Sequence, residues 1–224
     1  MSEKGIIYVM STAVEGLIKF GITQSFEARM HQLEHSGYRN VATLKRQFAI
    51  EVNDYADKEN LLKNLFESRR LGDSELFSMD LQYAIQLLSS FKGRQIYPND
   101  ETSEEVFERA TEIIESSKIP DGQYYLKAKC YGQNVKGILK VSEGKLTLLS
   151  GAILSPTANI QVKSYADARD NAHKEDNVLA EDISCNSVSM AAAIVCGRNE
   201  NGWEKWKNEN GEKINIYRQR NNND

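Results

Sequence analysis

The chain has 224 residues, of which 40% are hydrophobic, so it is long enough for one large or two ordinary folded domains. Its formal net charge of −4 predicts no strong, sequence-independent attraction to nucleic acid. No stretch approaches the roughly 18 apolar residues of a membrane span, and the first apolar run is too short for a signal peptide. We therefore expect a cytoplasmic protein without a membrane partner.

The excess negative charge is confined to the middle of the chain. Residues 1–98 hold 12 Lys+Arg and 12 Asp+Glu, residues 99–119 hold 2 and 7, and residues 120–224 hold 14 and 13. Both flanking segments can therefore carry local basic faces. The cysteines, Cys130, Cys185 and Cys196, have no C-x-x-C spacing and predict small buried hydrophobes rather than a disulfide framework or a zinc site.

Two short segments near the start, GIIYVMS and LIKFGIT, are rich in β-branched and aromatic residues and predict a β-hairpin. Strand alternation places Tyr8 on one face of the first strand, and Lys19, Gly21 and Thr23 on one face of the second. If the register brings these faces together, the Tyr8 hydroxyl and the Lys19 ammonium share a surface. Gly21 would then leave room for a ligand backbone to approach.

Two predicted helices follow, each with a charge on its apolar side. The first, FEARMHQLEH, has the stripe Phe26, Met30 and Leu33, and Arg29 lies beside it. The second, within DYADKENLLKNLFESRR, has Glu59 on its apolar face. One interpretation is a buried Arg29–Glu59 ion pair. The other is a guanidinium for phosphate and a carboxylate for a divalent cation.

The order and separation of IIYVM, KFGIT, SFEARMHQL, KENLLKNLF and ELFSM resemble the GIY-YIG nuclease superfamily over about residues 4–92. The similarity is greatest to its phage-type DNA-binding branch, in which KIG or KFG replaces YIG. The resemblance implies a small sheet flanked by helices and a DNA endonuclease that requires Mg²⁺ (or Mn²⁺). It implies catalytic roles for Tyr8, Lys19, Arg29 and Glu59, with Glu59 as the metal ligand and Gly21 as the motif glycine.

Lys19 departs from the family, which has a tyrosine at this position of its reaction centre. The ammonium could lower the pKa of Tyr8, so that Tyr8 acts as a general base toward water or positions it, or it could bind the scissile phosphate. Arg29 would stabilise the equatorial phosphate oxygens. The helical histidine of the family has no match, since Leu33 lies four residues after Arg29, and neither has its late asparagine. A non-cleaving DNA-binding module, or an adaptor of a restriction or defence complex, therefore remains the alternative.

Other side chains near this constellation are expected to contact DNA. They are Gly21, Thr23, His31, His35, Lys63, Arg69 and Arg70, and Lys45 with Arg46 would extend the same phosphate-contacting surface. For the charged residues the alternative is an ordinary solvated face. His31 and His35 have the i, i+4 spacing of a zinc pair, but no third ligand is nearby in the sequence, which favours a solvated or DNA-facing role.

The segment between Pro98 and Pro120 predicts a division of the chain. Residues 98–119 are expected to form an acidic helical linker that begins with a capping box at Thr102 and Glu105 and keeps its carboxylates in solvent. Residues 1–97 would then be the GIY-YIG-like domain, and residues 120–220 a β-rich α+β domain with a hairpin turning at Glu143-Gly144. The expected fold class is α+β throughout.

The segment SMAAAIVCGRNENGWEKWKNENG resembles a C-terminal domain of unknown function that often follows GIY-YIG modules and occurs in restriction-modification proteins. The resemblance rests on the small-residue helix, Gly197-Arg198, Asn201-Gly202-Trp203 and Trp206-Lys207. This resemblance carries no known mechanism. We expect a recognition or regulatory module, and for the whole chain we expect DNA and a protein of a restriction or phage-defence complex as partners. Trp203 and Trp206 are expected in the core, with base stacking as the alternative.

Overall fold

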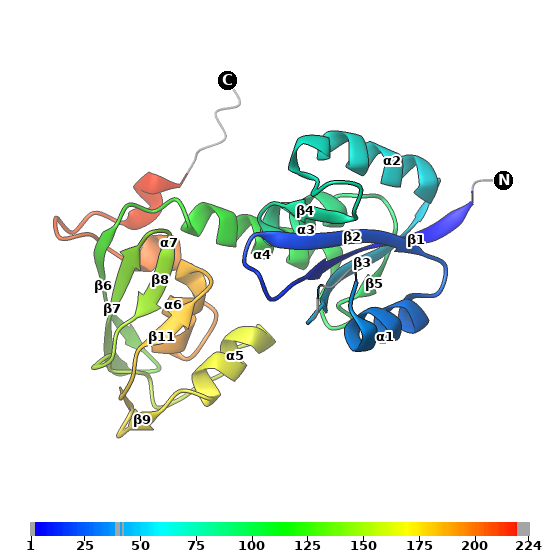
Figure 1. The fold of residues 1–224 in the computed structure, drawn as a ribbon. Coiled ribbons are helices and arrows are strands. Elements are labelled where there is room, and N and C mark those ends of the chain that lie inside the picture. The colour runs from blue at the N-terminus through cyan, green and yellow to red at the C-terminus, as the bar shows by residue number, and fades with distance from the viewer. Residues whose placement is uncertain (1–2, 39–40, 42, 219–224) are drawn as a thin grey trace. The chain divides into compact units, whose positions relative to one another are not determined.

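The structure is a computed structural model that describes residues 3–38, 41 and 43–218, shown in Figure 1. The fold is α+β, as expected, and the chain divides into two compact units, Met1–Thr111 and Glu112–Asp224. The boundary falls within helix α4 (Ser103–Ser116). The outermost residues of the two predicted domains, 1–2 and 219–220, lie outside the described residues.

The N-terminal unit is built on five antiparallel strands in the order β4-β2-β1-β3-β5. The strands are β1 (Lys4–Ser11), β2 (Leu17–Thr23), β3 (Lys45–Asn53), β4 (Leu76–Ser78) and β5 (Arg94–Tyr97). Alternation along β1 sends Ile7 and Val9 to one face and Tyr8 and Met10 to the other. All four are buried, so both faces of this sheet are covered.

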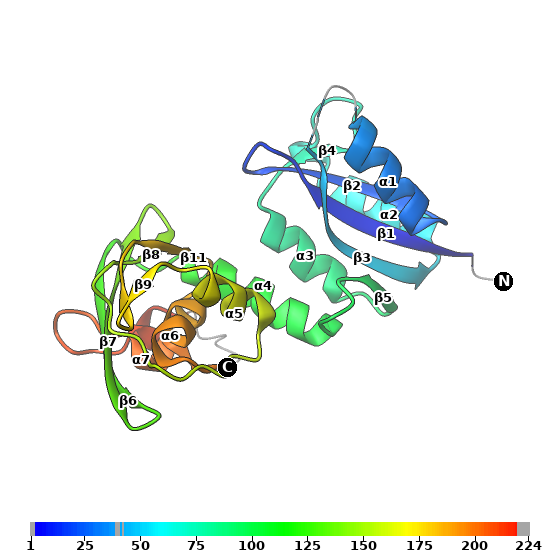
Figure 2. The same ribbon diagram turned by 90° about the horizontal axis from the view of Figure 1, so that it is seen from below.

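Figures 1 and 2 show helices on each side of this sheet. Helix α1 (Phe26–Ser36) buries its predicted stripe of Phe26, Met30 and Leu33 against the face that holds Tyr8. The other face is covered by α2 (Tyr55–Leu65), α3 (Leu81–Ser89) and the first part of α4, and η1 (Glu67–Arg69) follows α2. Helices α1 and α2 therefore approach the strands from opposite faces.

The C-terminal unit contains a four-stranded antiparallel sheet in the order β11-β8-β7-β6 and a separate two-stranded sheet. The strands are β6 (Gly122–Cys130), β7 (Gln133–Ser142), β8 (Lys145–Leu148) and β11 (Ile183–Cys185), with β9 (Lys174–Glu175) and β10 (Val178–Leu179) forming the smaller pair. The predicted β7–β8 hairpin turn is confirmed. Glu143 and Gly144 have φ values of 52° and 72°, which a two-residue turn of this hand requires.

The helices of this unit are α5 (Lys163–Asp170), α6 (Val188–Cys196), α7 (Gly202–Lys205) and η2 (Ile214–Tyr217). Helix α6 ends at Gly197, which has a φ of 72° and donates its N–H to Ala193 O at 2.8 Å. Trp203 and Trp206 are buried, and Trp206 Nε1 donates to Val188 O at 2.9 Å. The core prediction is confirmed, and burial excludes these two rings as base-stacking platforms.

Helix α4 is buried more deeply than a linker would be. Its capping box is confirmed, because Glu105 N donates to Thr102 Oγ1 at 3.2 Å and Thr102 N to Glu105 Oε2 at 2.7 Å. Val106 and Ala110 are each 1% exposed in the N-terminal core. Glu112 accepts the N–H of Ser189 at 3.2 Å, and burial raises its pKa. The prediction that the carboxylates of this helix lie in solvent was therefore wrong for Glu112.

Across residues 3–38, 41 and 43–218, the structure has no helix that combines the length and apolarity needed to cross a bilayer.

Candidate functional site around the edge of strand β2

The predicted juxtaposition of Tyr8 with the second strand is present. Tyr8 pairs with Gly21, and Met10 with Lys19, so Tyr8, Lys19 and Gly21 share one face. The Tyr8 hydroxyl lies over Gly21, where an added Cβ would overlap the hydroxyl and the ring. Gly21 therefore makes room for Tyr8 itself, and the expectation that it leaves room for a ligand backbone on this face was wrong.

Arg29 reaches the Tyr8 hydroxyl from helix α1. Its Nε donates to Tyr8 Oη at 3.2 Å, and its Nη1 donates to Gln32 Oε1 at 2.7 Å. The side chain is half-buried, and no carboxylate of the described residues lies within 4.0 Å of it. A guanidinium cannot lose its charge at ordinary pH, so an anion is the natural complement to this position.

Lys19 is enclosed instead of facing a substrate. Its side chain is 0% exposed, and its Nζ donates to Glu75 Oε2 and to Phe20 O, the latter at 3.1 Å. The same nitrogen lies 4.3 Å from the ring centroid of Tyr38 and 5.5 Å from that of Tyr8. Burial lowers the pKa of Lys19, and the hydrogen bond to Glu75 opposes this shift. The predicted contact between Lys19 and a phosphate is therefore contradicted by its burial.

The predicted lowering of the Tyr8 pKa is also wrong. Burial raises the pKa of Tyr8, because desolvation disfavours the phenolate, and the hydrogen bond from Arg29 opposes the rise without reversing it. Tyr8 is thus a neutral hydroxyl near pH 7, and the cation that touches its oxygen is Arg29.

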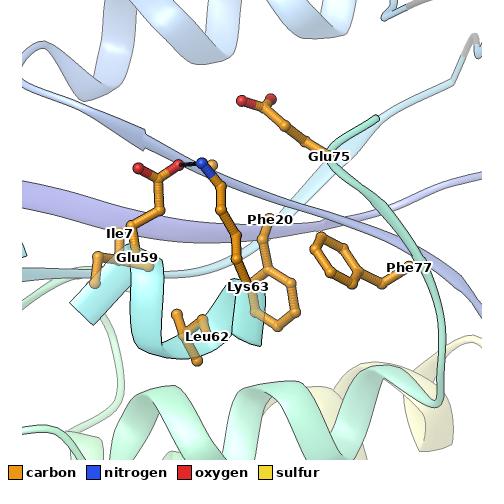
Figure 3. A pocket seen from close by; sticks show the side chains of 8 residues that line it. Ile7, Phe20, Glu59, Leu62, Lys63, Glu75 and Phe77 are labelled. Carbon is orange, nitrogen blue, oxygen red and sulfur yellow. Dashed lines mark ion pairs between the residues drawn. The ribbon is translucent and has the colours of Figure 1, made fainter. Parts of the chain in front are cut away.

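Two carboxylates line one small pocket on the other side of β2, shown in Figure 3. The pocket is lined by Ile7, Phe20, Gly21, Glu59, Leu62, Lys63, Glu75 and Phe77. Glu59 is 17% exposed and forms an ion pair with Lys63 at 2.9 Å, whereas Glu75 is 31% exposed. The predicted Arg29–Glu59 ion pair is absent among these contacts, because α1 and α2 pack on opposite faces of the sheet.

The two halves of the site meet at the edge of β2. Strand β4 pairs with Leu17, Ile18 and Lys19, and Phe20 N donates to Glu75 O at 3.1 Å. Beyond that point β2 continues to Thr23. Gly21 thus borders the Tyr8 hydroxyl on one face and the pocket of Glu59 and Glu75 on the other. The backbone of β2 lies between them, and Glu75 links the two, because it lines the pocket and also binds Lys19 on the Tyr8 face.

The remaining predicted DNA contacts fall into two groups. Lys63 is paired with Glu59, Arg70 Nε donates to Ser74 O at 2.6 Å, and Thr23 Oγ1 donates to Ser25 O at 3.1 Å. These three have partners within the fold. Exposed side chains form the second group, which consists of His31, His35 and Arg69.

His31 and His35 stack with their ring centroids 4.1 Å apart, and His35 Nδ1 lies 2.8 Å from His31 O. The described residues bring no third potential ligand to this pair. The geometry therefore gives no support to zinc binding at these histidines.

Arg46 was expected on the phosphate-contacting surface, but it is neutralised within the fold. It donates to both oxygens of Glu34, at 2.9 and 2.8 Å, and to Glu27 at 3.0 Å. Its guanidinium also lies over the rings of Phe26 and Tyr97. This prediction was wrong, because two carboxylates distant in the sequence converge on one arginine. Its neighbour Lys45 is exposed.

One cluster of potential metal ligands lies in the C-terminal unit. The ligand atoms of Cys130, Cys196 and Glu200 lie within 4.8 Å of one another. However, Glu200 already forms ion pairs with Arg198 and Lys205, at 2.8 and 3.2 Å, and burial raises the pKa of the Cys196 thiol. A soft metal needs thiolates, so this cluster fits the predicted role of the cysteines as buried small residues better than a metal centre.

Sequence reasoning missed Glu75 and Tyr38 as parts of the N-terminal site. Glu75 lies in ELFSM, one of the segments that carried the family resemblance, but no role was assigned to it. The available signal was the lysine in a strand with a buried face, because a buried ammonium requires a carboxylate partner. Tyr38 lies just beyond α1, and its hydroxyl accepts the N–H of Glu75 at 3.3 Å.

Comparisons with known proteins find two segments of this chain that match family models. Residues 5–92 match the T5orf172 domain, a nuclease-like domain found in phage and restriction contexts. Residues 163–218 match DUF4357, a domain of unknown function. No curated protein and no solved structure matches the chain. Tyr8, Lys19, Arg29, Glu59 and Glu75 all fall inside the first match.

Proposed function

We propose that the N-terminal unit is a divalent-metal-dependent DNA endonuclease of the GIY-YIG type, acting in restriction or phage defence. The observation that carries this proposal is the half-buried Arg29, which is hydrogen-bonded to the Tyr8 hydroxyl and has no carboxylate partner among the described residues. A phosphodiester would supply the missing anion at Arg29, at the edge of the sheet where Gly21 borders both the Tyr8 hydroxyl and the pocket of Glu59 and Glu75.

The donor set at the pocket fits a hard cation. Glu59 and Glu75 contribute carboxylate oxygens, which Mg²⁺ and Mn²⁺ prefer, and Mg²⁺ commonly takes one or two carboxylates while keeping several waters. Lys63 and Lys19 pair with these two carboxylates in the structure and balance their charge. A bound divalent cation would supply neutralisation of charge on the phosphate and on the leaving oxygen.

Arg29, Tyr8 and Lys19 have different roles in this proposal. Arg29 binds the non-bridging phosphate oxygens and stabilises the charge that grows on them in the transition state. Tyr8 accepts a hydrogen bond from Arg29 and is kept protonated by burial, so its O–H can orient a water or a phosphate oxygen. Lys19 is a positioning residue that fixes Glu75. The general-base role expected for Tyr8 is therefore not part of this proposal.

A second candidate is a DNA-binding module that does not cleave. The observation in its favour is Lys19, which stands at the second tyrosine position of the motif and is buried against Glu75 instead of presenting a second hydroxyl. In this case Arg29 binds a phosphate, and Glu59 and Glu75 serve the fold. An adaptor of a restriction or defence complex is a variant of this candidate with a protein partner.

Cleavage of labelled single- and double-stranded DNA by the full chain tests the proposal, with Mg²⁺, with Mn²⁺ and with EDTA. Wild type is expected to cut only with metal, and Glu59→Gln to lose about 100-fold or more in rate, the usual scale for removing one electrostatic group from a site. Glu67→Gln, which removes an exposed carboxylate in η1, is the matched control and should cut like wild type.

Two other results would decide against cleavage at this site. If no metal supports cutting while wild type and Arg29→Ala differ in DNA affinity, the binding module is correct. If Glu59→Gln and Glu67→Gln cut equally well, Glu59 is not a metal ligand, and the proposed site fails even though the protein is a nuclease.

A further inference from the structure

The four-stranded sheet of the C-terminal unit has one face that is exposed to solvent. Residues of β6 and β7 alternate between a core that includes Leu126, Leu139 and α6 and an outward side that is exposed. The outward residues of these two strands are Gln123, Tyr125, Lys127, Lys129, Asn134, Lys136, Ile138, Lys140 and Ser142. We call the part formed by Lys127, Lys129, Lys136, Lys140, Tyr125 and Ile138 the lysine face.

The lysine face carries positive charge that the fold does not neutralise. None of its four lysines forms an ion pair within 4.0 Å with a described residue, although many other cations of the chain do. The outward positions of β6 and β7 include no acidic residue. Glu209 lines a shallow hollow with Lys140 at one end of this surface.

Folding alone does not favour this arrangement. Lys127 and Lys136 stand directly opposite each other in the β6–β7 ladder, so their Cβ atoms are about 5 Å apart. Lys127 and Lys129 lie two residues apart on the same strand, which is about 7 Å. Like charges opposite each other in a sheet destabilise it. A role in binding an anion with repeated charges explains why four lysines are placed together.

Apolar groups lie among the lysines. Tyr125 pairs with Ile138 between the Lys127–Lys136 pair and Lys140, and Tyr125 is 36% exposed. On the other edge of β7, the exposed Ile153 pairs with Lys136, and the exposed Val178 pairs with Ile153. A surface that combines unpaired cations with an exposed aromatic ring and aliphatic side chains matches a polymer that combines phosphates with bases.

We infer that the lysine face is a nucleic-acid-binding surface that contacts the phosphates of a single strand through Lys127, Lys129, Lys136 and Lys140 and a base through Tyr125. Nothing in the family match of this unit assigns such a role. The inference concerns affinity in the absence of metal, so it stands apart from the cleavage proposed for the N-terminal unit. The overall charge of −4 does not oppose it, because phosphates respond to the local surface.

Binding of the full chain to a labelled single-stranded oligonucleotide in EDTA, over a salt series, tests this inference. The variant K127Q/K129Q/K136Q/K140Q is expected to bind at least about tenfold more weakly at low salt. The slope of log Kobs against log[salt] should fall in magnitude by about 3, since each phosphate contact to a single strand contributes about 0.7. Its thermal midpoint should equal or exceed that of wild type, which separates lost binding from lost folding.

The matched control is K118Q/K163Q/K205Q/K213Q, which removes the same charge from other places in the same unit. It should leave the slope within about 1 of wild type. Equal losses in the two variants would reduce the effect to net charge and overturn the inference. An unchanged salt slope in K127Q/K129Q/K136Q/K140Q would also overturn the inference. The same holds if this variant binds anionic phospholipid vesicles more weakly than wild type but binds the oligonucleotide equally well. Arg29→Ala, measured alongside, reports on the N-terminal site separately.

Discussion

At the scale of single residues, the N-terminal site depends on Gly21, which has no side chain. Gly21 lets the Tyr8 hydroxyl lie against the β2 backbone, where Arg29 Nε can donate to it. The backbone of Gly21 does not need a left-handed conformation, so the requirement is for space and not for conformational freedom. A glycine in the middle of a strand usually weakens the strand. Here the close approach of the Tyr8 ring and hydroxyl explains why a glycine occupies this position.

Gly21→Ala should therefore damage both stability and activity. The added methyl would overlap the Tyr8 hydroxyl and ring, and overpacking of this kind costs about 1–3 kcal/mol in the free energy of unfolding. Urea denaturation measures this loss, and the cleavage assay measures the accompanying displacement of Tyr8. Tyr8→Phe is the companion variant, because it removes one hydrogen bond worth about 1 kcal/mol and keeps the ring. A Gly21→Ala protein as stable and active as wild type would contradict this explanation.

The sequence could predict the neighbours of Tyr8 but not their chemistry. Period-two alternation placed Tyr8, Lys19 and Gly21 on one face, and the register confirms it. The protonation of Tyr8 and the burial of Lys19 depend on Tyr38 and Glu75, which are distant in sequence and come together only through the path of the chain after α1 and before β4. No local pattern reports such contacts.

At the scale of elements, helix α1 is tied to strand β3 by one arginine. Arg46 at the start of β3 binds Glu34 of α1 with two hydrogen bonds and also binds Glu27 in the first turn of the helix. The same helix carries Arg29 to the Tyr8 hydroxyl. The Arg46 contacts therefore help to fix the helix that presents Arg29. The apolar stripe of α1 was predictable from period 3.6, whereas this ion-pair network was not, because its members are separated by up to 19 residues.

Glu34→Gln is expected to lower the free energy of unfolding by about 1 kcal/mol at pH 7, because it removes a bidentate charge-assisted interaction. Arg46 holds the pKa of Glu34 below its usual value of 4.5. The stabilisation from the Glu34–Arg46 interaction is therefore present above pH 4.5 and is lost as the pH falls through the lower pKa of Glu34 in the folded state. Unfolding curves at several pH values should show wild type and variant converging in acid. Glu27→Gln, at the more exposed contact, should change stability less at pH 7; an effect as large as that of Glu34→Gln would contradict this account.

At the scale of the whole molecule, the chain is two α+β units whose cores share no strand but whose sequence boundary lies inside α4. The acidic composition of residues 98–119 suggested a solvated linker. Composition alone could not show that two apolar residues of this segment, Val106 and Ala110, are core residues of the N-terminal unit. In the C-terminal unit the hairpin and the end of α6 were predictable, because Glu143-Gly144 and Gly197 specify their turns directly.

A fragment that ends at residue 97 should consequently be less stable than one that ends at residue 118. It loses Val106 and Ala110 and uncovers the apolar surface on which they pack, a difference of about 3 kcal/mol in the free energy of unfolding. Urea denaturation of the two fragments measures it. Equal midpoints would show that residues 98–118 are dispensable for the N-terminal core, as the composition-based boundary at 97 assumed.

The burial of Lys19 has a consequence for chemical modification of the protein. Acylation of a lysine removes its charge, and it requires an amine that a reagent or enzyme can reach. Lys19 is 0% exposed and held by Glu75, so the folded chain protects the lysine that fixes Glu75. The lysines of the C-terminal sheet are all exposed. Acylation would therefore erase the charge of that face, while Lys19 would keep its charge and its contact with Glu75.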